Sequence, residues 1–430
     1  MRSTGLAAKF RWWMQLGAGV ALVSLVCACG GGGGGGGSSS SGSGNSSTPS
    51  GPSQQPIAAN AANTAAITLG TGVTGVINIP TVSVTICVPG STSNCQTVNN
   101  IQVDTGSFGL RIASAALSAS LVGALPVAKA PAVAGAQLAE CAIFADGYAW
   151  GTVRTATVSI AGETAASIPV HILGDLSAST VPSKGCVSGM ALSTPSDLGA
   201  NGILGIGVAP YDCGVTCQDS TSAATYSNYY ACPNGTNCVR TAVPVGQQVA
   251  NPVVRYASDN NGVIVLMAPI SSSGAPSATG TLVFGIGTES NNTLAAAQTF
   301  TTNAYGDLTN SSFNGQTVTA FFDSGSNAYF FVDGSLPLCT SYSGFYCPTS
   351  QQTRQVTVVG LNNVKATASL DILSAATLFA NSANFAFNDL AGQFGSASTV
   401  DIGVPFFFGR YLYYGFDQSA SGGQQPYVGY

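Results

Sequence analysis

Two four-residue segments place an acid where it could do acid–base chemistry. Each follows an apolar run and consists of an Asp, a small hydroxyl residue, a Gly and a second hydroxyl residue: Asp104-Thr105-Gly106-Ser107 and Asp323-Ser324-Gly325-Ser326. An apolar run that ends in such a turn and then resumes is typical of two strands joined by a tight loop. Because the whole pattern recurs, we predict that Asp104 and Asp323 are equivalent and that two lobes each lend one carboxylate to a shared site.

The residues around each Asp have a physical reason to be there. Gly106 and Gly325 let the backbone turn tightly, so that its N–H groups approach a carboxylate that a side chain would keep away. Four hydroxyl groups can donate to the carboxylates or tie the two loops together, those of Thr105, Ser107, Ser324 and Ser326. Two carboxylates held this close cannot both ionise easily, which leaves one base and one acid.

With these motifs the chain resembles the pepsin-like aspartic peptidases, whose two lobes each carry an Asp-Thr/Ser-Gly motif and, later, an apolar segment with Gly. Further anchor segments that look like this family lie at residues 201–207, 280–285, 401–407 and 411–417. The resemblance spans roughly residues 65–417. It implies an all-β, bilobal fold with the active-site cleft between an N-terminal lobe at 57–268 and a C-terminal lobe at 269–430.

The resemblance also implies a flap, which is a hairpin that covers the cleft. Residues 147–161 alternate strongly and look like this hairpin, with Tyr148 as the flap tyrosine and Phe144 as the alternative. The family usually has a Trp seven residues after the first Asp, and this chain has Arg111 there. A cation near the cleft could lower the pKa of a carboxylate or bind an acidic group of the substrate.

Cysteine usage indicates an oxidising compartment. The chain has 12 cysteines, and without the two in the N-terminal segment an even number remains, which allows up to five disulfides. The candidates are Cys87, Cys95, Cys141, Cys186, Cys213, Cys217, Cys232, Cys238, Cys339 and Cys347. Their spacing suggests two local loop closures, Cys87–Cys95 and Cys339–Cys347, and leaves Cys141 and Cys186 as a possible pair. The pairing of the four at 213–238 stays open, and a zinc site there is an alternative that their spacing disfavours.

The first 29 residues have the features of a targeting segment. Basic residues precede an apolar run at 14–26 that is too short to span a membrane, and a small-residue site with Cys29 follows. This ending resembles a bacterial lipoprotein signal, which implies a lipid on Cys29 and, because no Asp follows, anchoring in the outer membrane. A plain secretory signal or an uncleaved anchor is the alternative. Residues 30–56, rich in Gly, Ser and Pro, should form a flexible tether.

Composition and charge argue against a nucleic acid partner, and the single histidine argues against a histidine-based site. Only 7% of the residues are charged, against about 25% in ordinary soluble domains, and closely spaced turn formers favour a mostly β chain. The formal net charge of −5 offers no basic patch, so we expect no nucleic acid partner. The single histidine, His171, lies in an apolar run without a nucleophile motif. We therefore expect a strand residue there and neither a Ser-His triad, a metal site nor a cofactor.

Two functions remain open. The first is an aspartic endopeptidase, a monomer in which Asp104 and Asp323 activate a water against an extended peptide substrate. The second is a catalytically silent surface lipoprotein of pepsin-like fold that binds a ligand through its cleft or its Cys-rich insertion, and the chain also resembles an uncharacterised family of bacterial lipoproteins. Retention of both acids and of all four hydroxyl groups favours catalysis.

Overall fold

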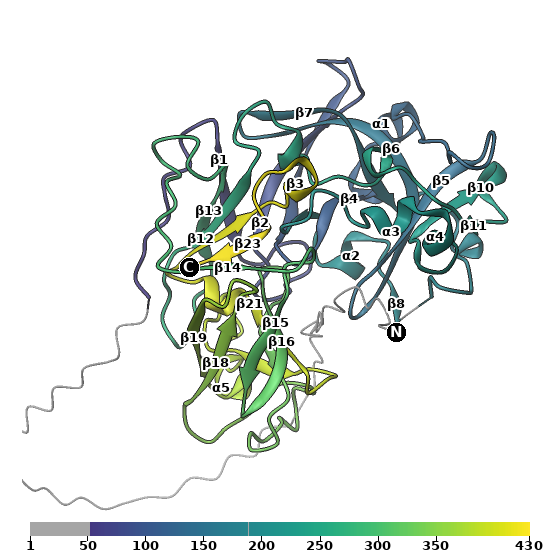
Figure 1. Ribbon diagram of the computed structural model, residues 1–430. Coiled ribbons are helices and arrows are strands. Elements are labelled where there is room, and N and C mark those ends of the chain that lie inside the picture. Colours follow the sequence, from purple (N-terminus) through teal and green to yellow (C-terminus); the bar gives the residue numbers. More distant parts are fainter. Residues whose placement is uncertain (1–51, 188) are drawn as a thin grey trace, which may run out of the picture.

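The computed structural model describes residues 52–187 and 189–430, which form strands and short helices (Figure 1). The strands are β1 (Thr64–Leu69), β2 (Thr81–Cys87), β3 (Cys95–Asp104), β4 (Phe108–Ala113), β5 (Gln137–Ile143), β6 (Gly147–Ile160), β7 (Glu163–Leu173), β8 (Met190–Ala191), β9 (Gly202–Ile206), β10 (Tyr229–Cys232), β11 (Val239–Arg240), β12 (Gly262–Met267), β13 (Ala278–Phe284), β14 (Thr299–Thr301), β15 (Leu308–Phe313), β16 (Gln316–Asp323), β17 (Tyr329–Phe331), β18 (Gln352–Val359), β19 (Lys365–Ile372), β20 (Ala391–Gln393), β21 (Thr399–Gly403), β22 (Tyr411–Gly415) and β23 (Tyr427–Gly429). The α-helices are α1 (Ala119–Ala124), α2 (Pro195–Leu198), α3 (Val215–Gln218), α4 (Ser220–Tyr226) and α5 (Ala375–Leu378), and 3-10 turns lie at Ser114–Ala116, Ala178–Thr180, Pro233–Gly235, Val245–Gln247, Pro252–Arg255, Val404–Phe407 and Ser419–Ser421.

One long sheet runs from the N-terminal half of the chain into its C-terminal half. Its strand order is β11-β10-β5-β6-β7-β4-β9-β3-β2-β1-β13-β12-β22-β23-β14, with β8 beside β6. β1 pairs along its whole length with β13, from Thr64 opposite Val283 to Leu69 opposite Ala278. The expected lobe boundary at 268/269 falls between β12 and β13, which are antiparallel neighbours in this sheet.

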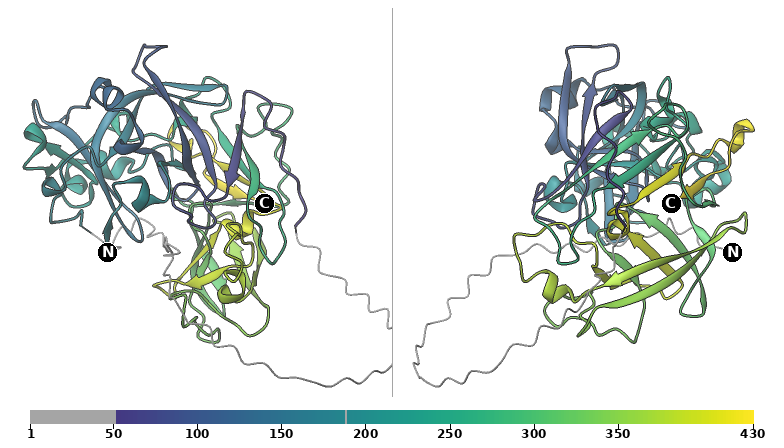
Figure 2. Two further views of the ribbon diagram at one scale, coloured as in Figure 1. Left: turned by 180° about the vertical axis from the view of Figure 1, so that it is seen from behind. Right: turned by 90° about the vertical axis from the view of Figure 1, so that its left-hand side faces the viewer.

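A second sheet holds the other described strands, in the order β19-β18-β15-β16-β21-β17-β20. Figures 1 and 2 show these green and yellow-green strands as a separate body beside the long sheet. The mostly β architecture with two bodies confirms the fold class that the sequence predicted.

The two sheets repeat one local unit around each Asp. In the first, β3 pairs in parallel with β9, so that Asp104 lies opposite Gly205. In the second, β16 pairs in parallel with β21, so that Asp323 lies opposite Gly403. After each Asp turn the chain folds back along the same partner strand, as β4 does on β9 and β17 on β21. The segments at 201–207 and 401–407 therefore occupy equivalent places.

The glycines opposite the two acids leave room for this return of the chain. A Cβ at Gly205 would lie 2.6 Å from the backbone nitrogen of Phe108. A Cβ at Gly403 would lie 2.1 Å from the carbonyl oxygen of Ala328. Real Cβ atoms do not approach backbone atoms this closely, so any side chain at either position would push the Asp loop away from its partner strand.

The ten candidate cysteines form five disulfides. The two local closures, Cys87–Cys95 and Cys339–Cys347, are present, and so is the possible pair Cys141–Cys186. The clustered cysteines, whose pairing the sequence left open, form Cys213–Cys217 and Cys232–Cys238. All four sulfurs of that cluster are thus used in covalent bonds, which leaves no thiolate there for a zinc ion.

The N-terminal segment is described only from Pro52 onward, so the lipoprotein signal, Cys29 and tether residues 30–51 lie outside the described residues. The last residues of the expected tether contact the folded body, because the N–H of Gln54 donates to the carbonyl of Gly409 at 3.0 Å and Tyr411 donates to that of Gln55 at 2.7 Å. Among residues 52–187 and 189–430, no helix has the length and apolar character to cross a membrane.

Candidate functional site

The two Asp loops meet between the two sheets. A Cβ placed on Gly325 would lie 2.4 Å from Oδ1 of Asp104 and 3.0 Å from Oδ1 of Asp323, so both carboxylates approach Gly325 on the side where a side chain would lie. The two Oδ1 atoms therefore cannot be farther apart than the sum of those distances. Both side chains are buried, with 2% and 0% of the residue exposed. The structure brings together the two acids that the sequence predicted to be equivalent, although 219 residues separate the loops.

Reciprocal hydrogen bonds tie the loops to each other. The N–H of Thr105 donates to Oγ of Ser324 at 3.1 Å, and the N–H of Ser324 donates to Oγ1 of Thr105 at 2.9 Å. Each hydroxyl then donates across to a carbonyl of the opposite strand, Thr105 to Phe322 at 3.2 Å and Ser324 to Val103 at 2.8 Å. Each hydroxyl both accepts and donates, so neither is left unsatisfied in this buried place.

Within each loop the Gly N–H and the second hydroxyl hold the carboxylate. The contacts are Gly106 N to Asp104 Oδ1 at 2.9 Å, Ser107 Oγ to Asp104 Oδ2 at 2.5 Å, Gly325 N to Asp323 Oδ1 at 2.8 Å and Ser326 Oγ to Asp323 Oδ2 at 2.9 Å. Donors of this kind stabilise an ionised carboxylate and fix its plane. All eight residues of the two motifs thus take part in one arrangement.

Two further residues support the loops, and sequence reasoning did not select them. Gln102 donates from Nε2 to the carbonyl of Gly325 at 2.9 Å, and Tyr414 donates to the carbonyl of Phe322 at 3.1 Å. Burial raises the pKa of Tyr414 well above its ordinary value, so its hydroxyl stays a neutral donor. Each is a polar residue in a buried strand, and this is the signal that the sequence offered. Gln102 lies two residues before Asp104 in β3, and Tyr414 lies in β22.

The flap hairpin differs from the prediction. Residues 147–160 are one strand, β6, and the hairpin beside the first Asp loop is made by β5 and β6 with its turn at 144–146. Phe144 lines a small pocket, open to solvent, together with Gly106 and Ser107. Tyr148 instead packs against the apolar cluster around Trp150. The structure therefore places Phe144, the alternative, in one pocket with Gly106 and Ser107 of the first Asp loop, because the hairpin turn directs it there.

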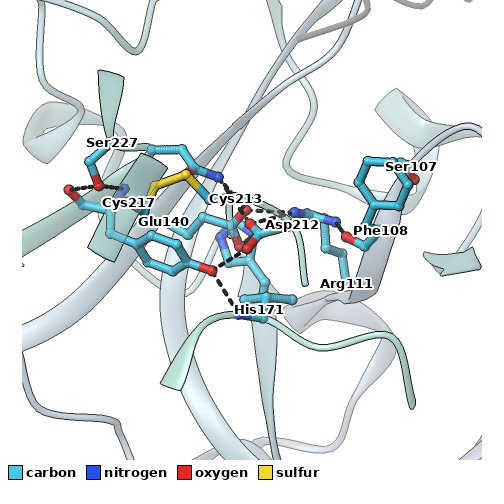
Figure 3. A network of polar contacts seen from close by, with 12 residues as sticks. Ser107, Phe108, Arg111, Glu140, His171, Asp212, Cys213, Cys217 and Ser227 are labelled. Carbon is cyan, nitrogen blue, oxygen red and sulfur yellow. Dashed lines mark hydrogen bonds and ion pairs between the residues drawn. A yellow bond between two sulfur atoms is a disulfide. The ribbon is translucent and has the colours of Figure 1, made fainter. Parts of the chain in front are cut away.

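Arg111 lines the same pocket, and its guanidinium bonds to groups of its own lobe. Its guanidinium donates to the carbonyl of Phe108 and to Oε1 of Glu140, both at 2.6 Å, and to Oδ2 of Asp212 at 3.2 Å (Figure 3). Only 3% of Arg111 is exposed. The charge that could have faced Asp104 or a substrate acid is thus directed toward two buried carboxylates of its own lobe.

A buried network of polar side chains surrounds Arg111 and its two carboxylate partners, Glu140 and Asp212 (Figure 3). Nδ1 of His171 lies 3.0 Å from Oε2 of Glu140, while Tyr229 donates to Oδ1 of Asp212 at 2.5 Å and Asn228 donates to its Oδ2 at 2.9 Å. Burial alone would raise the pKa of Glu140, but Arg111 and His171 outweigh it and lower that pKa well below its ordinary value. Burial, followed by the charge of Glu140, raises the pKa of Asp212 well above its ordinary value.

Sequence reasoning treated His171 as a strand residue, and it lies in β7 as expected. The sequence pattern does not predict that Glu140 and Asp212 contact Arg111, because they are 29 and 101 residues away from it. The clue was a Glu in the middle of the buried strand β5. Among the described residues, no group of three or more His, Cys, Asp or Glu side chains is arranged to hold a metal ion.

Comparisons with known proteins give a family match and similar solved structures. A family model described as "Protein of unknown function (DUF3443)" matches residues 59–430. No curated protein matches the chain. The solved structures with similar folds include the crystal structure of an aspartic proteinase from Irpex lacteus, at 15% sequence identity and a TM-score of 0.45, with 85% of this chain and 97% of that chain covered.

Proposed function

The chain belongs to the DUF3443 family, and from its paired Asp loops we propose that it is an aspartic endopeptidase. The observation that carries the proposal is that the carboxylates of Asp104 and Asp323 converge on one place, the side of Gly325 where a Cβ atom would lie. Reciprocal bonds between Thr105 and Ser324 hold the pair in place. A purely structural turn would not need two buried carboxylates at this separation, since each costs free energy to bury.

The proposed reaction uses one carboxylate and one carboxylic acid. The carboxylate takes a proton from a water, the water oxygen attacks the peptide carbonyl carbon, and the acid gives its proton to the carbonyl oxygen. The carboxyl group that took the proton from water then gives a proton to the peptide nitrogen as the C–N bond breaks. The attack of water has left two hydroxyl groups on the former carbonyl carbon. One of them returns its proton to the second carboxyl group while the carbonyl re-forms. The pair formed by Asp104 and Asp323, called the dyad below, ends with the single proton with which it began. No acyl-enzyme arises.

The substrate in this proposal is an extended peptide, which passes over the dyad of a monomer beside the pocket that Phe144 and Arg111 line. The pocket has aromatic and apolar walls formed by Phe108, Ile143 and Tyr305. A substrate side chain next to the cleaved bond would occupy it. No cofactor, metal ion or nucleic acid is required for this chemistry.

The test is cleavage of a peptide library by the purified protein between pH 3 and 7. The two carboxylates are coupled, so we expect a bell-shaped profile whose limbs belong to the pair, and inhibition by a statine-type transition-state mimic. A folded protein that cuts no peptide at any pH in this range contradicts the proposal.

A catalytically silent binding protein is the second candidate, and one observation favours it. The residue beside the first Asp loop is Phe144, which has no hydroxyl group to place over a substrate, and the neighbouring Arg111 is held by Glu140 and Asp212. In that case the pocket would bind a ligand without turnover. Peptide binding measured by calorimetry in the absence of cleavage would support this function in place of the first.

We also propose that Cys29 carries a lipid that anchors the protein in the outer membrane of a bacterial envelope. The support is the sequence pattern of the first 29 residues and the oxidised state of all ten cysteines beyond them. Metabolic labelling with a palmitate analogue should mark the wild type and should fail to mark Cys29→Ala. Full labelling of Cys29→Ala would overturn the anchor, and Cys27→Ala is the matched control that should keep the label.

A further inference from the structure

A third buried acid contacts the site through a hydroxyl group. Asp401 lies in β21, where it pairs with Phe321 on one side and Phe330 on the other, and it is fully buried. Its Oδ2 lies 2.5 Å from Oγ of Ser326. The same Ser326 Oγ lies 2.9 Å from Oδ2 of Asp323. The Ser326 hydroxyl therefore bridges the carboxyl groups of Asp323 and Asp401.

The protons in this bridge can be counted. A serine hydroxyl has one proton to donate, whereas an ionised carboxylate can only accept. If both Asp323 and Asp401 were ionised, Ser326 could donate to one of them only, and its lone pairs would face the other at hydrogen-bonding distance. Such a contact is repulsive, and burial removes the water that would screen it. The bridge is satisfied when one of the two carboxyl groups carries a proton and donates it to Ser326.

We infer that Asp401 is a third acid of the site, which shares one proton with Asp323 through the hydroxyl of Ser326. Its role is that of a positioning residue, because it acts on Asp323 through Ser326 and not on a substrate. The catalytic consequence rests on the proposed function, but the shared proton itself does not.

The surroundings of Asp401 make its charge matter to the dyad. Its ladder neighbours on β16 and β17 are phenylalanines, which bring no charge. The titratable groups near it include Asp323 at the end of β16, Asp104 at the end of β3 and Tyr414 on β22, and Tyr414 interacts electrostatically with all three acids. When Asp401 is ionised, its negative charge opposes loss of the last proton from the dyad. Asp401 would thus extend peptidase activity toward higher pH.

The first test does not depend on activity. In the full-length Asp104→Asn protein, the dyad has lost one acid, so Asp323 and Asp401 are the remaining carboxyl groups of this cluster. Infrared spectra at pH 6 should show a band of a protonated, buried carboxyl group that is absent from Asp104→Asn/Asp401→Asn. In the double variant the Asn amide donates to Ser326 and Ser326 donates to Asp323, so no shared proton is needed. Identical carboxyl bands in the two proteins would overturn the inference.

The second test is the pH profile of cleavage by Asp401→Asn in an otherwise wild-type chain. We expect the basic limb to move to lower pH by on the order of one unit. Asp389→Asn is the matched control: it removes another buried Asp, whose pKa burial raises to about 7, and should leave the limbs in place. An unmoved limb in Asp401→Asn overturns the catalytic consequence. If the wild type cuts nothing but the infrared band is lost as expected, the shared proton stands and the proposed function fails.

Discussion

Replacing Asp104 or Asp323 by Asn is expected to lower kcat for peptide cleavage by about a thousand-fold or more. An Asn amide neither takes a proton from water nor gives one to the carbonyl oxygen, so either replacement removes one of the two partners in proton transfer. The loop should keep its shape, since the amide oxygen still accepts from the Gly N–H that now bonds Oδ1. The measurement is kcat from single-turnover cleavage at the pH optimum of the wild type.

The control for this prediction is Asp371→Asn, which neutralises an exposed acid on β19 and should leave kcat unchanged. The two dyad variants should unfold in urea no more easily than the wild type, because Asn keeps the contact with the Gly N–H and no second carboxyl group then opposes ionisation of the remaining acid. Wild-type turnover by Asp104→Asn or by Asp323→Asn would exclude that acid from the reaction. Loss of cleavage together with loss of the fold would show only that the loop had collapsed.

Replacing Arg111 by Met is expected to lower the free energy of unfolding by about 3–5 kcal/mol, the usual cost of leaving a buried charge without its partner. Glu140 would then lack the cation that lies 2.6 Å from its Oε1, in a place with no exposed surface. Glu140 has a lowered pKa in the folded wild type, so its contribution is present above the ordinary Glu pKa and is lost as the pH falls through the folded value. In Arg111→Met the main cause of the lowered pKa is gone, so burial raises the pKa of Glu140 and its carboxyl group takes up a proton as the pH falls from 7 to 4. The deficit of Arg111→Met should therefore shrink in acid.

Urea unfolding at pH 7 and at pH 4 measures both parts of this prediction. The free energy of unfolding that Arg111→Met/Glu140→Gln loses should be smaller than the sum of the losses in the two single variants. The reason is that Glu140, whose buried charge has no cation in Arg111→Met, is neutral as Gln. Lys365→Met removes an exposed cation from β19 and should change the free energy by no more than about 0.5 kcal/mol. A loss below about 1 kcal/mol in Arg111→Met would mean that its charge is not needed by the network.

Much of the site could be predicted because its chemistry is local in sequence. Each loop contains its own acid, glycine and hydroxyl donors within four residues, so the contacts from Gly106 and Ser107 to Asp104 are built into the motif. The flap was predicted less well. Alternation shows that residues 147–160 form a strand, but it does not show which neighbour pairs with it, and pairing with β5 set the turn at Phe144.

The sequence alone determined the strand content, the two Asp motifs and the short disulfide loops such as Cys87–Cys95, since periodicity and short spacing constrain the chain over a few residues. The tertiary structure decided everything that joins distant segments. It placed Glu140 and Asp212 on Arg111, and it brought Asp401 to Ser326 across 75 residues. The physical reason is register: a strand pattern tells which face a side chain occupies, while the alignment of neighbouring strands determines which group it meets there.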